Sequence, residues 1–176
     1  PEALSRFYLH GTGGPAARIG ATWMTREDRE AEIADYVRYL DRALDAVRAR
    51  RGSAPFRLRV FGFSQGATTA CRWLAHRHAA GAAPAEHLVL WGGGVPPEFD
   101  DAPDARGAAL RATRLMLVVG DADEFITADA VVEQQARLAR LGVAHRLVRY
   151  AGTHRVPAEE LAPVLAGDLD EVHDRA

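Results

Sequence analysis

The chain contains 176 residues, and its 22 Lys and Arg nearly balance its 24 Asp and Glu, giving a formal net charge of -2 at pH 7. This balance gives no electrostatic reason to expect binding to nucleic acid or to an anionic membrane surface. Cys71 is the only cysteine, which excludes an intrachain disulfide and predicts a reducing, cytoplasmic location. No membrane span and no signal segment are expected, because no apolar stretch approaches the roughly 20 residues that a span needs. We expect one domain over residues 1–176, large enough to bury a single core.

The first predicted element is a long amphipathic helix that follows Thr25 and ends near Arg51. Thr25 is an N-cap candidate because an acidic residue, Asp28, lies three positions later. The apolar residues of this segment recur at three- and four-residue steps: Ile33, Tyr36, Val37, Leu40, Leu44 and Val47. Its charged residues are predicted to form a solvated face, and the stretch Gly52 to Pro55 ends the helix.

Strands and helices alternate in the remainder of the chain. Strands are predicted at about 57–62, 87–91, 114–120 and 144–150, and helices at about 65–80, 128–141 and 157–172. Thr127 can cap the second of these helices, Gly142 can close it, and Pro157 suits the first turn of the third. The alternation predicts an α/β fold, a three-layer sandwich around a mainly parallel sheet.

The segment Gly62-Phe63-Ser64-Gln65-Gly66 follows an apolar run and precedes a predicted helix. It fits the pattern Gly-x-Ser-x-Gly, which places a serine hydroxyl on a sharp turn between a strand and a helix. We expect glycine at both flanking positions because a Cβ two residues before or after the serine would crowd the strand or the helix. The interpretation that competes with a nucleophile is an ordinary glycine-rich turn.

A serine hydroxyl needs a base to take its proton and a third group to orient that base. In a parallel sheet such partners are expected on loops after later strands. His154 follows the last predicted strand and is the favoured base. The other histidines lie in predicted helices, at strand starts or in the tail, and His10, also on a loop, precedes the serine.

For the acid, the loop after the strand at 114–120 offers Asp121, Asp123 and Glu124. Asp121 follows the strand directly and could simply cap the turn, whereas Asp123 lies further out and could curl back to an imidazole. We therefore favour Asp123. No metal site is expected, since these residues lack the spacing of paired ligands.

Five segments together resemble the α/β-hydrolase fold, and in particular the phospholipase/carboxylesterase family that includes acyl-protein thioesterases and small bacterial esterases. They are Gly62 to Ala67 (nucleophile motif), Gly120 to Asp123 (acid motif), Gly152 to His154 (base motif), Trp91 to Pro96 (glycine-rich loop lining the acyl pocket) and Trp23 to Arg29 (start of the preceding helix).

The resemblance implies a serine hydrolase that cleaves carboxylic ester or thioester bonds through an acyl-enzyme. Ser64, Asp123 and His154 would form the triad, and the Gln65 N–H would donate to the oxyanion. Trp23, Trp91 and Gly92 would contact a small-molecule acyl ester. No cofactor is expected.

The sequence departs from this family near its start. His10 to Gly14 resembles the His-Gly loop that supplies the first oxyanion donor, but no strand is predicted between Gly14 and Leu58, so we expect a surface turn there. The chain is then predicted to be the C-terminal part of the fold, truncated at the N-terminus, with the nucleophile strand as an exposed sheet edge. Such an edge favours homodimerisation, and loss of one oxyanion donor typically costs about 10²–10³ in rate.

Two other functions compete with this one. A catalytically impaired fragment could act by association through the exposed edge of the sheet. A dienelactone-hydrolase-like enzyme is a further alternative, although that family's usual nucleophile is cysteine and Ser64 stands at this position.

Overall fold

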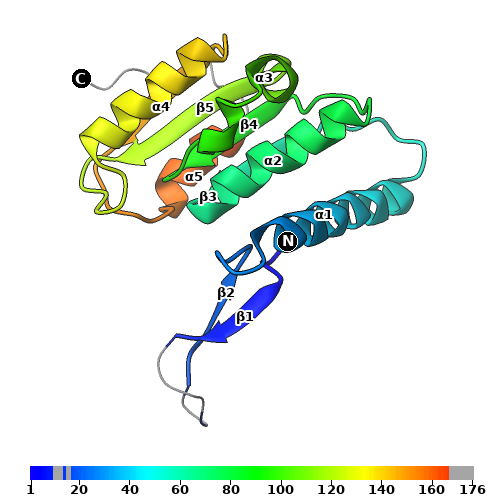
Figure 1. The fold of residues 1–176 in the computed structure, drawn as a ribbon, viewed down its shortest axis with the longest axis horizontal. Coiled ribbons are helices and arrows are strands. Elements are labelled where there is room, and N and C mark those ends of the chain that lie inside the picture. The colour runs from blue at the N-terminus through cyan, green and yellow to red at the C-terminus, as the bar shows by residue number, and fades with distance from the viewer. Residues whose placement is uncertain (10–13, 15–16, 167–176) are drawn as a thin grey trace.

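The structure is a computed structural model that describes residues 1–9, 14 and 17–166. Its elements are strands and helices in alternation after an N-terminal pair of strands (Figure 1). In chain order they are β1 (Ser5–Tyr8), β2 (Ile19–Thr22), α1 (Arg29–Arg51), β3 (Arg59–Phe63), α2 (Gln65–Ala79), β4 (His87–Trp91), the 3-10 helix η1 (Pro97–Phe99), α3 (Pro103–Arg111), β5 (Arg114–Gly120), α4 (Ala128–Arg140), β6 (His145–Tyr150) and α5 (Ala158–Ala166).

The main sheet contains four parallel strands in the order β3-β4-β5-β6. All four were predicted within two residues of their observed bounds, and the predicted α/β class is confirmed. Among the described residues β3 pairs only with β4, so the strand that leads to Ser64 lies at the edge of the sheet, as predicted. Because every strand points the same way, the loops that follow them gather at one edge of the sheet.

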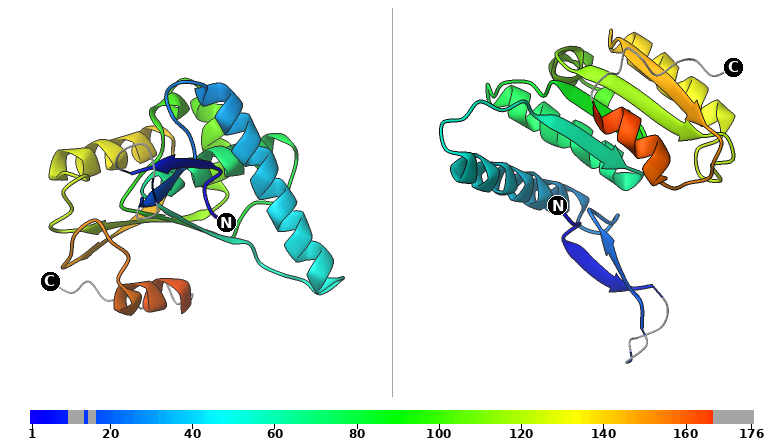
Figure 2. Two further views of the ribbon diagram at one scale, coloured as in Figure 1. Left: turned by 90° about the horizontal axis from the view of Figure 1, so that it is seen from below. Right: turned by 180° about the vertical axis from the view of Figure 1, so that it is seen from behind.

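Helices cover the two faces of the sheet unequally (Figure 2, left). On one face, Leu88, Leu90, Leu115 and Leu117 pack into a large core with side chains of α1, α2, α3 and α4. On the other face, alternate residues of the same strands form a smaller cluster with α5: Val89, Trp91, Met116, Val118, Tyr150 and Val164. This period-two division is what a strand buried on both faces produces, and it gives the predicted three layers.

The N-terminal segment differs from the prediction. β1 and β2 form an antiparallel hairpin separate from the main sheet, and it projects away from the helices (Figure 1). The prediction of no strand between Gly14 and Leu58 was therefore wrong. Each strand has only four residues, and β1 shows no alternation of burial, so the pattern carried little signal. Residues 10–13 of the predicted surface turn lie outside the described residues.

Four predicted helix ends can be compared with the structure. α1 begins after Asp28 and not after Thr25, whose hydroxyl donates to Glu32 Oε2 at 2.9 Å instead of capping the helix. The cap at Thr127 is confirmed by its bond from the Ala130 N–H, and Gly142 closes α4 with a φ of 64°. Pro157 lies one residue before α5.

Helices α3 and η1 were not predicted. The segment rich in Asp and Pro before α3 resembles a loop, yet Pro103 occupies the first turn, where a missing N–H costs nothing. α3 packs Leu110 into the large core. Within the described part of the chain, no helix has the length and apolarity needed to cross a membrane.

Candidate active site

Ser64 occupies the turn between β3 and α2 in a strained backbone conformation. Its φ of 54° makes it the only non-glycine residue with positive φ among those the structure describes, and such a sparsely populated conformation costs about 1–3 kcal/mol. The Ser64 N–H donates to the Trp91 carbonyl at 2.8 Å, and the Ser64 carbonyl accepts from the Ala67 N–H at 3.0 Å. The ladder with β4 and the first turn of α2 therefore hold the serine from both sides.

The two glycines that flank Ser64 differ in their role. A Cβ at Gly62 would lie 2.4 Å from the Gly66 carbonyl oxygen, so the expected steric requirement at Gly62 is confirmed. At Gly66 the nearest atom is the Trp23 indole nitrogen at 3.8 Å, an ordinary contact. The expectation that a Cβ at Gly66 would crowd the turn was therefore wrong.

The His154 imidazole lies between Ser64 and Asp123. Its Nε2 is 2.9 Å from Ser64 Oγ, and its Nδ1 is 2.9 Å from Asp123 Oδ2. An ionised carboxylate only accepts hydrogen bonds, so Nδ1–H donates to Asp123 and Nε2 is left to accept the serine proton. The three residues come from loops that follow β3, β5 and β6, at the same edge of the sheet.

The Asp123 carboxylate is buried and fully engaged, with 1% of its side chain exposed. Its Oδ1 accepts the N–H groups of Phe125 and Ile126, each at 2.9 Å. Burial on its own would raise the pKa of Asp123, but the hydrogen bonds from His154, Phe125 and Ile126 outweigh it and hold the pKa below its ordinary value. Asp123 is therefore ionised in the form that orients His154.

The two competing acids lie elsewhere. Asp121 is exposed and pairs with Arg149 at 3.5 Å. Glu124 accepts the backbone N–H of His154 at 3.3 Å, which steadies the loop but not the ring. Of the three acids considered, Asp123 alone contacts the imidazole.

Three side-chain or backbone contacts fix the plane of the imidazole. The rings of Phe63 and Phe125 each lie 4.8 Å from it, Phe125 edge-on. Gly92 has a φ of 55°, and a Cβ there would lie 3.0 Å from His154 Cε1. Phe63 and Phe125 were not predicted as site residues. The available signal was their position, since Phe63 directly precedes Ser64 and Phe125 lies two residues after Asp123.

The residues predicted to bind substrate fall in different places. Gly92 lies against the imidazole, and Trp23 is half-buried against Tyr36, with ring centroids 6.0 Å apart. The Trp91 side chain is 1% exposed and donates to the Arg155 carbonyl at 2.8 Å. This packing gives no support to direct contact between Trp91 and a substrate.

Gln65 is the first residue of α2. The first four N–H groups of a helix have no acceptor within it, so the Gln65 N–H is suited to an anionic oxygen bound at Ser64. In the described part of the chain, no group of three or more His, Cys, Asp or Glu residues could hold a metal ion.

A parallel α/β sheet that carries a serine on a strained strand-to-helix turn, with acid and histidine on later loops in that order, defines the α/β-hydrolase fold class. A model of the family described as serine hydrolase (FSH1) matches residues 13–163, and the chain belongs to this family. A comparison with curated proteins gave no match.

Solved structures agree on the fold. Acyl-protein thioesterase 2 of Zea mays matches with a TM-score of 0.59 and 18% identity, over 89% of this chain and 68% of that one. Esterase PE8 matches with a TM-score of 0.57 and 23% identity, over 84% and 68%. The Bacillus cereus carboxylesterase matches with a TM-score of 0.55 and 17% identity, over 77% and 59%. This chain thus spans about two thirds or less of the length of these structures.

Proposed function

We propose that this serine hydrolase cleaves carboxylic ester or thioester bonds of small acyl substrates through a covalent acyl-enzyme. The observation that carries the proposal is the continuous contact from Ser64 Oγ through His154 to Asp123, with both distances at 2.9 Å. Membership of the serine hydrolase family supports the same chemistry, as do the names of the structures with the same fold.

In the first half of the reaction, Ser64 Oγ attacks the carbonyl carbon while His154 Nε2 takes the hydroxyl proton. The oxygen of the resulting tetrahedral intermediate accepts a hydrogen bond from the Gln65 N–H. As the bond to the leaving group breaks, the imidazolium returns the proton to the departing oxygen or sulfur. Asp123 stabilises the imidazolium without taking its proton.

In the second half, His154 Nε2 takes a proton from water, and the hydroxide attacks the acyl-Ser64 carbonyl. The second tetrahedral intermediate collapses with release of the carboxylic acid, and the imidazolium returns its proton to Ser64 Oγ. The strained turn at Ser64 leaves its hydroxyl exposed for both attacks.

A fluorophosphonate probe tests the proposal, because it forms a covalent bond only with an activated serine. We expect labelling of the peptide that contains Ser64, together with hydrolysis of p-nitrophenyl acetate. Both should be lost in Ser64→Ala and kept in Ser53→Ala, whose serine is exposed on the loop after α1. Labelling that persists in Ser64→Ala would assign the nucleophile to another residue.

The alternative of a silent fragment has no support from the family match. Homodimerisation through the β3 edge stays a prediction.

A further inference from the structure

Residues 92–96, the glycine loop after β4, lie directly against both the candidate nucleophile and the candidate base. A Cβ at Gly92 would be 3.0 Å from His154 Cε1, and a Cβ at Gly93 would be 2.5 Å from the Ser64 carbonyl oxygen. Glycine at these two positions lets the backbone of the loop approach the imidazole and the serine turn this closely. The position of the imidazole therefore depends on what holds the glycine loop in place.

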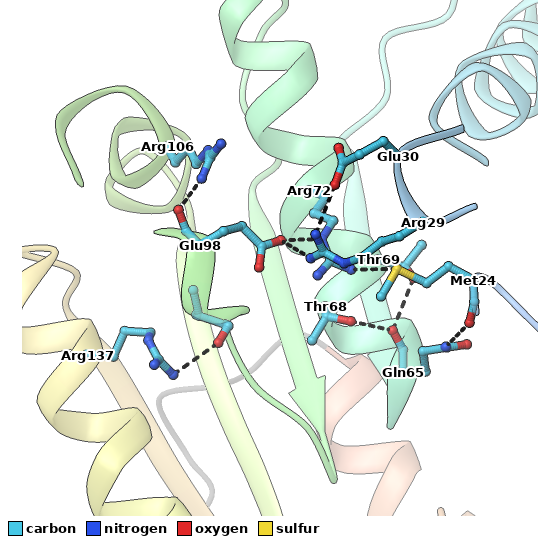
Figure 3. A network of polar contacts seen from close by, with 11 residues as sticks. Met24, Arg29, Glu30, Gln65, Thr68, Thr69, Arg72, Glu98, Arg106 and Arg137 are labelled. Atoms are coloured by element: carbon cyan, nitrogen blue, oxygen red, sulfur yellow. Dashed lines mark hydrogen bonds and ion pairs between the residues drawn. The ribbon is translucent and has the colours of Figure 1, made fainter. Parts of the chain in front are cut away.

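Two side chains of α4 hold the glycine loop at Val95. Gln134 Oε1 accepts the Val95 N–H at 2.9 Å, and the Arg137 guanidinium donates to the Val95 carbonyl at 3.4 Å (Figure 3). Val95 is 1% exposed, so its backbone groups have no access to water. Buried backbone groups need hydrogen-bond partners, and at Val95 both partners come from α4.

Gln134 fits closely against the glycine loop. A Cβ at Gly94 would lie 2.4 Å from Gln134 Cδ, so the amide lies directly against the backbone of the loop. The Val95 N–H can only donate, which requires the oxygen of the amide to face it. Glutamate would keep an oxygen acceptor at this place. Methionine has a similar length but only a weak acceptor, so it would leave the buried Val95 N–H without a good partner.

Ion pairs fix the chain on the far side of the glycine loop, in and next to η1 (Figure 3). Glu98 pairs with Arg72 of α2 at 2.6 Å and with Arg29 at 3.2 Å, and Asp100 pairs with Arg137 of α4 at 3.0 Å. Burial on its own would raise the pKa of Glu98, but the hydrogen bond from Arg72 outweighs it and holds the pKa below its ordinary value. With β4 fixed in the sheet and η1 fixed by these pairs, the bonds at Val95 set the course of the loop between them.

The helix that holds the glycine loop also follows the loop of the acid. Asp123 Oδ1 accepts the Ile126 N–H at 2.9 Å, and Thr127 then caps α4 by accepting the Ala130 N–H at 3.2 Å. Gln134 lies about two helical turns beyond this cap. A single helix thus connects the loop that binds His154 Nδ1 with the loop that lies against His154 Cε1.

We infer that Gln134 is a positioning residue, whose bond to the Val95 N–H holds the glycine loop against the imidazole of His154. The inference rests on the proposed function. Without this bond the loop moves away from the ring, and the imidazole loses the surface against its Cε1 edge. The alignment of Nε2 with Ser64 Oγ then becomes less exact, so the loss should fall on kcat and not on KM.

The first test is kcat for p-nitrophenyl acetate, expressed per active site after counting the sites by complete fluorophosphonate labelling. Gln134→Met should lower kcat about tenfold, because a small misplacement of a reacting group is costly, and should leave KM within about twofold. Gln134→Glu keeps the acceptor, so it should stay within about twofold of the parental kcat. Gln135→Met is the matched control on the same helix, also half-buried, and should keep the parental kcat.

A double-mutant cycle separates positioning from a merely structural role. Gly92→Ala places a methyl group against the imidazole and already displaces the ring. Adding Gln134→Met to Gly92→Ala should therefore lower kcat by less than about twofold, because both changes act on the same contact. A further tenfold loss in that background overturns the inference, and so does a parental kcat in a folded Gln134→Met variant.

Where Gln134→Met does not fold by circular dichroism, Gln134→Asn decides, because its side chain is one carbon shorter and cannot reach the Val95 N–H. A loss of about tenfold in kcat then supports the inference, and a parental kcat overturns it. Failure of the proposed function gives a different result. The parent chain would then hydrolyse the ester no faster than Ser64→Ala, and the inference would fall with the proposed function.

Discussion

The parallel strands of the main sheet all begin along one edge and all end along the opposite edge. These two edges differ in what they offer to a ligand. At the edge where the strands begin lies a hollow of about 840 Å³, lined by charged groups that include Arg57, Glu86, Arg114 and His145. At the edge where the strands end lie Ser64, His154 and Asp123. Cavity volume and charge would direct attention to the first edge, whereas backbone strain and converging hydrogen bonds mark the second.

The two edges differ because their charged side chains have different surroundings. At the first edge Glu86 is paired with Arg57 at 3.0 Å and Arg59 at 3.4 Å in contact with water, and such exposed pairs contribute at most about 1 kcal/mol. At the second edge the carboxylate of Asp123 is buried and directed at a single imidazole. Substitutions at the two edges should therefore have very different effects on activity.

The largest expected effect in this comparison is at the acid. Asp123→Asn should lower kcat for p-nitrophenyl acetate by about 10⁴-fold, because the amide favours the wrong imidazole tautomer and cannot stabilise the imidazolium. Asp121→Asn, two positions earlier and exposed, should stay within about twofold of the parent. A loss confined to Asp121→Asn would transfer the role of the acid and leave the mechanism standing.

The next effect separates backbone strain from contact with the imidazole. Gly92→Ala places a methyl group 3.0 Å from His154 Cε1, and we expect the displaced ring to cost about 10²-fold in kcat/KM. Gly81→Ala is the matched control, since Gly81 has a φ of 74° and nothing within 4 Å of its Cβ position. Both variants should lose about 1–2 kcal/mol of unfolding free energy, measured by urea denaturation, but only Gly92→Ala should lose activity. Equal activity of the two variants would contradict the role of Gly92.

The contact of His154 with Ser64 and Asp123 could be predicted from the sequence because the rules involved are local. A strand followed by Gly62 to Gly66 and a helix predicts the turn, and parallel strands bring the loops bearing Asp123 and His154 to the same edge. The contacts around the imidazole could not be predicted in this way. Gly92 and Phe125 lie 62 and 29 positions from His154 in the sequence, and their relation depends on how three loops pack.

The N-terminal part was predicted least well for a related reason. Its hairpin strands are too short to show a period, and their place is fixed by the contact of Gln65 with Thr22, Trp23 and Met24. A glutamine directly after Ser64 carries no sequence signal that identifies the partners of its side chain. The pattern predicted Gln65 as a backbone donor and gave no role to its side chain.

A smaller effect is expected from the side chain that covers the imidazole. Phe125 is 69% exposed, yet its ring lies 4.8 Å from His154. Phe125→Ala should remove this edge-on contact, worth about 0.5–1.5 kcal/mol, and lower kcat by about three- to tenfold. Val132→Ala on α4, also exposed and apolar, is the matched control and should leave kcat unchanged. An effect on KM with kcat unchanged would show that Phe125 binds substrate and does not hold the ring.

The smallest effect on activity is expected at the opposite edge, where His87 begins β4 and is almost fully buried. Burial lowers the pKa of His87, and the nearby cations Arg59, Arg114 and Arg57 lower it further, against the opposing effect of Glu86. The unfolded chain therefore takes up a proton on this histidine near pH 6.5, before the folded chain does. The contribution of neutral His87 to stability is fully present above that pH and is lost as the pH falls through the lower, folded-state pKa.

In His87→Gln the decrease in unfolding free energy between pH 7 and pH 5, measured by urea denaturation, should be smaller than in the parent, while kcat/KM at pH 8 stays within about twofold. The same pH dependence in both proteins would show that His87 does not titrate differently on folding, and a large loss of activity at pH 8 would show that the two edges are not independent.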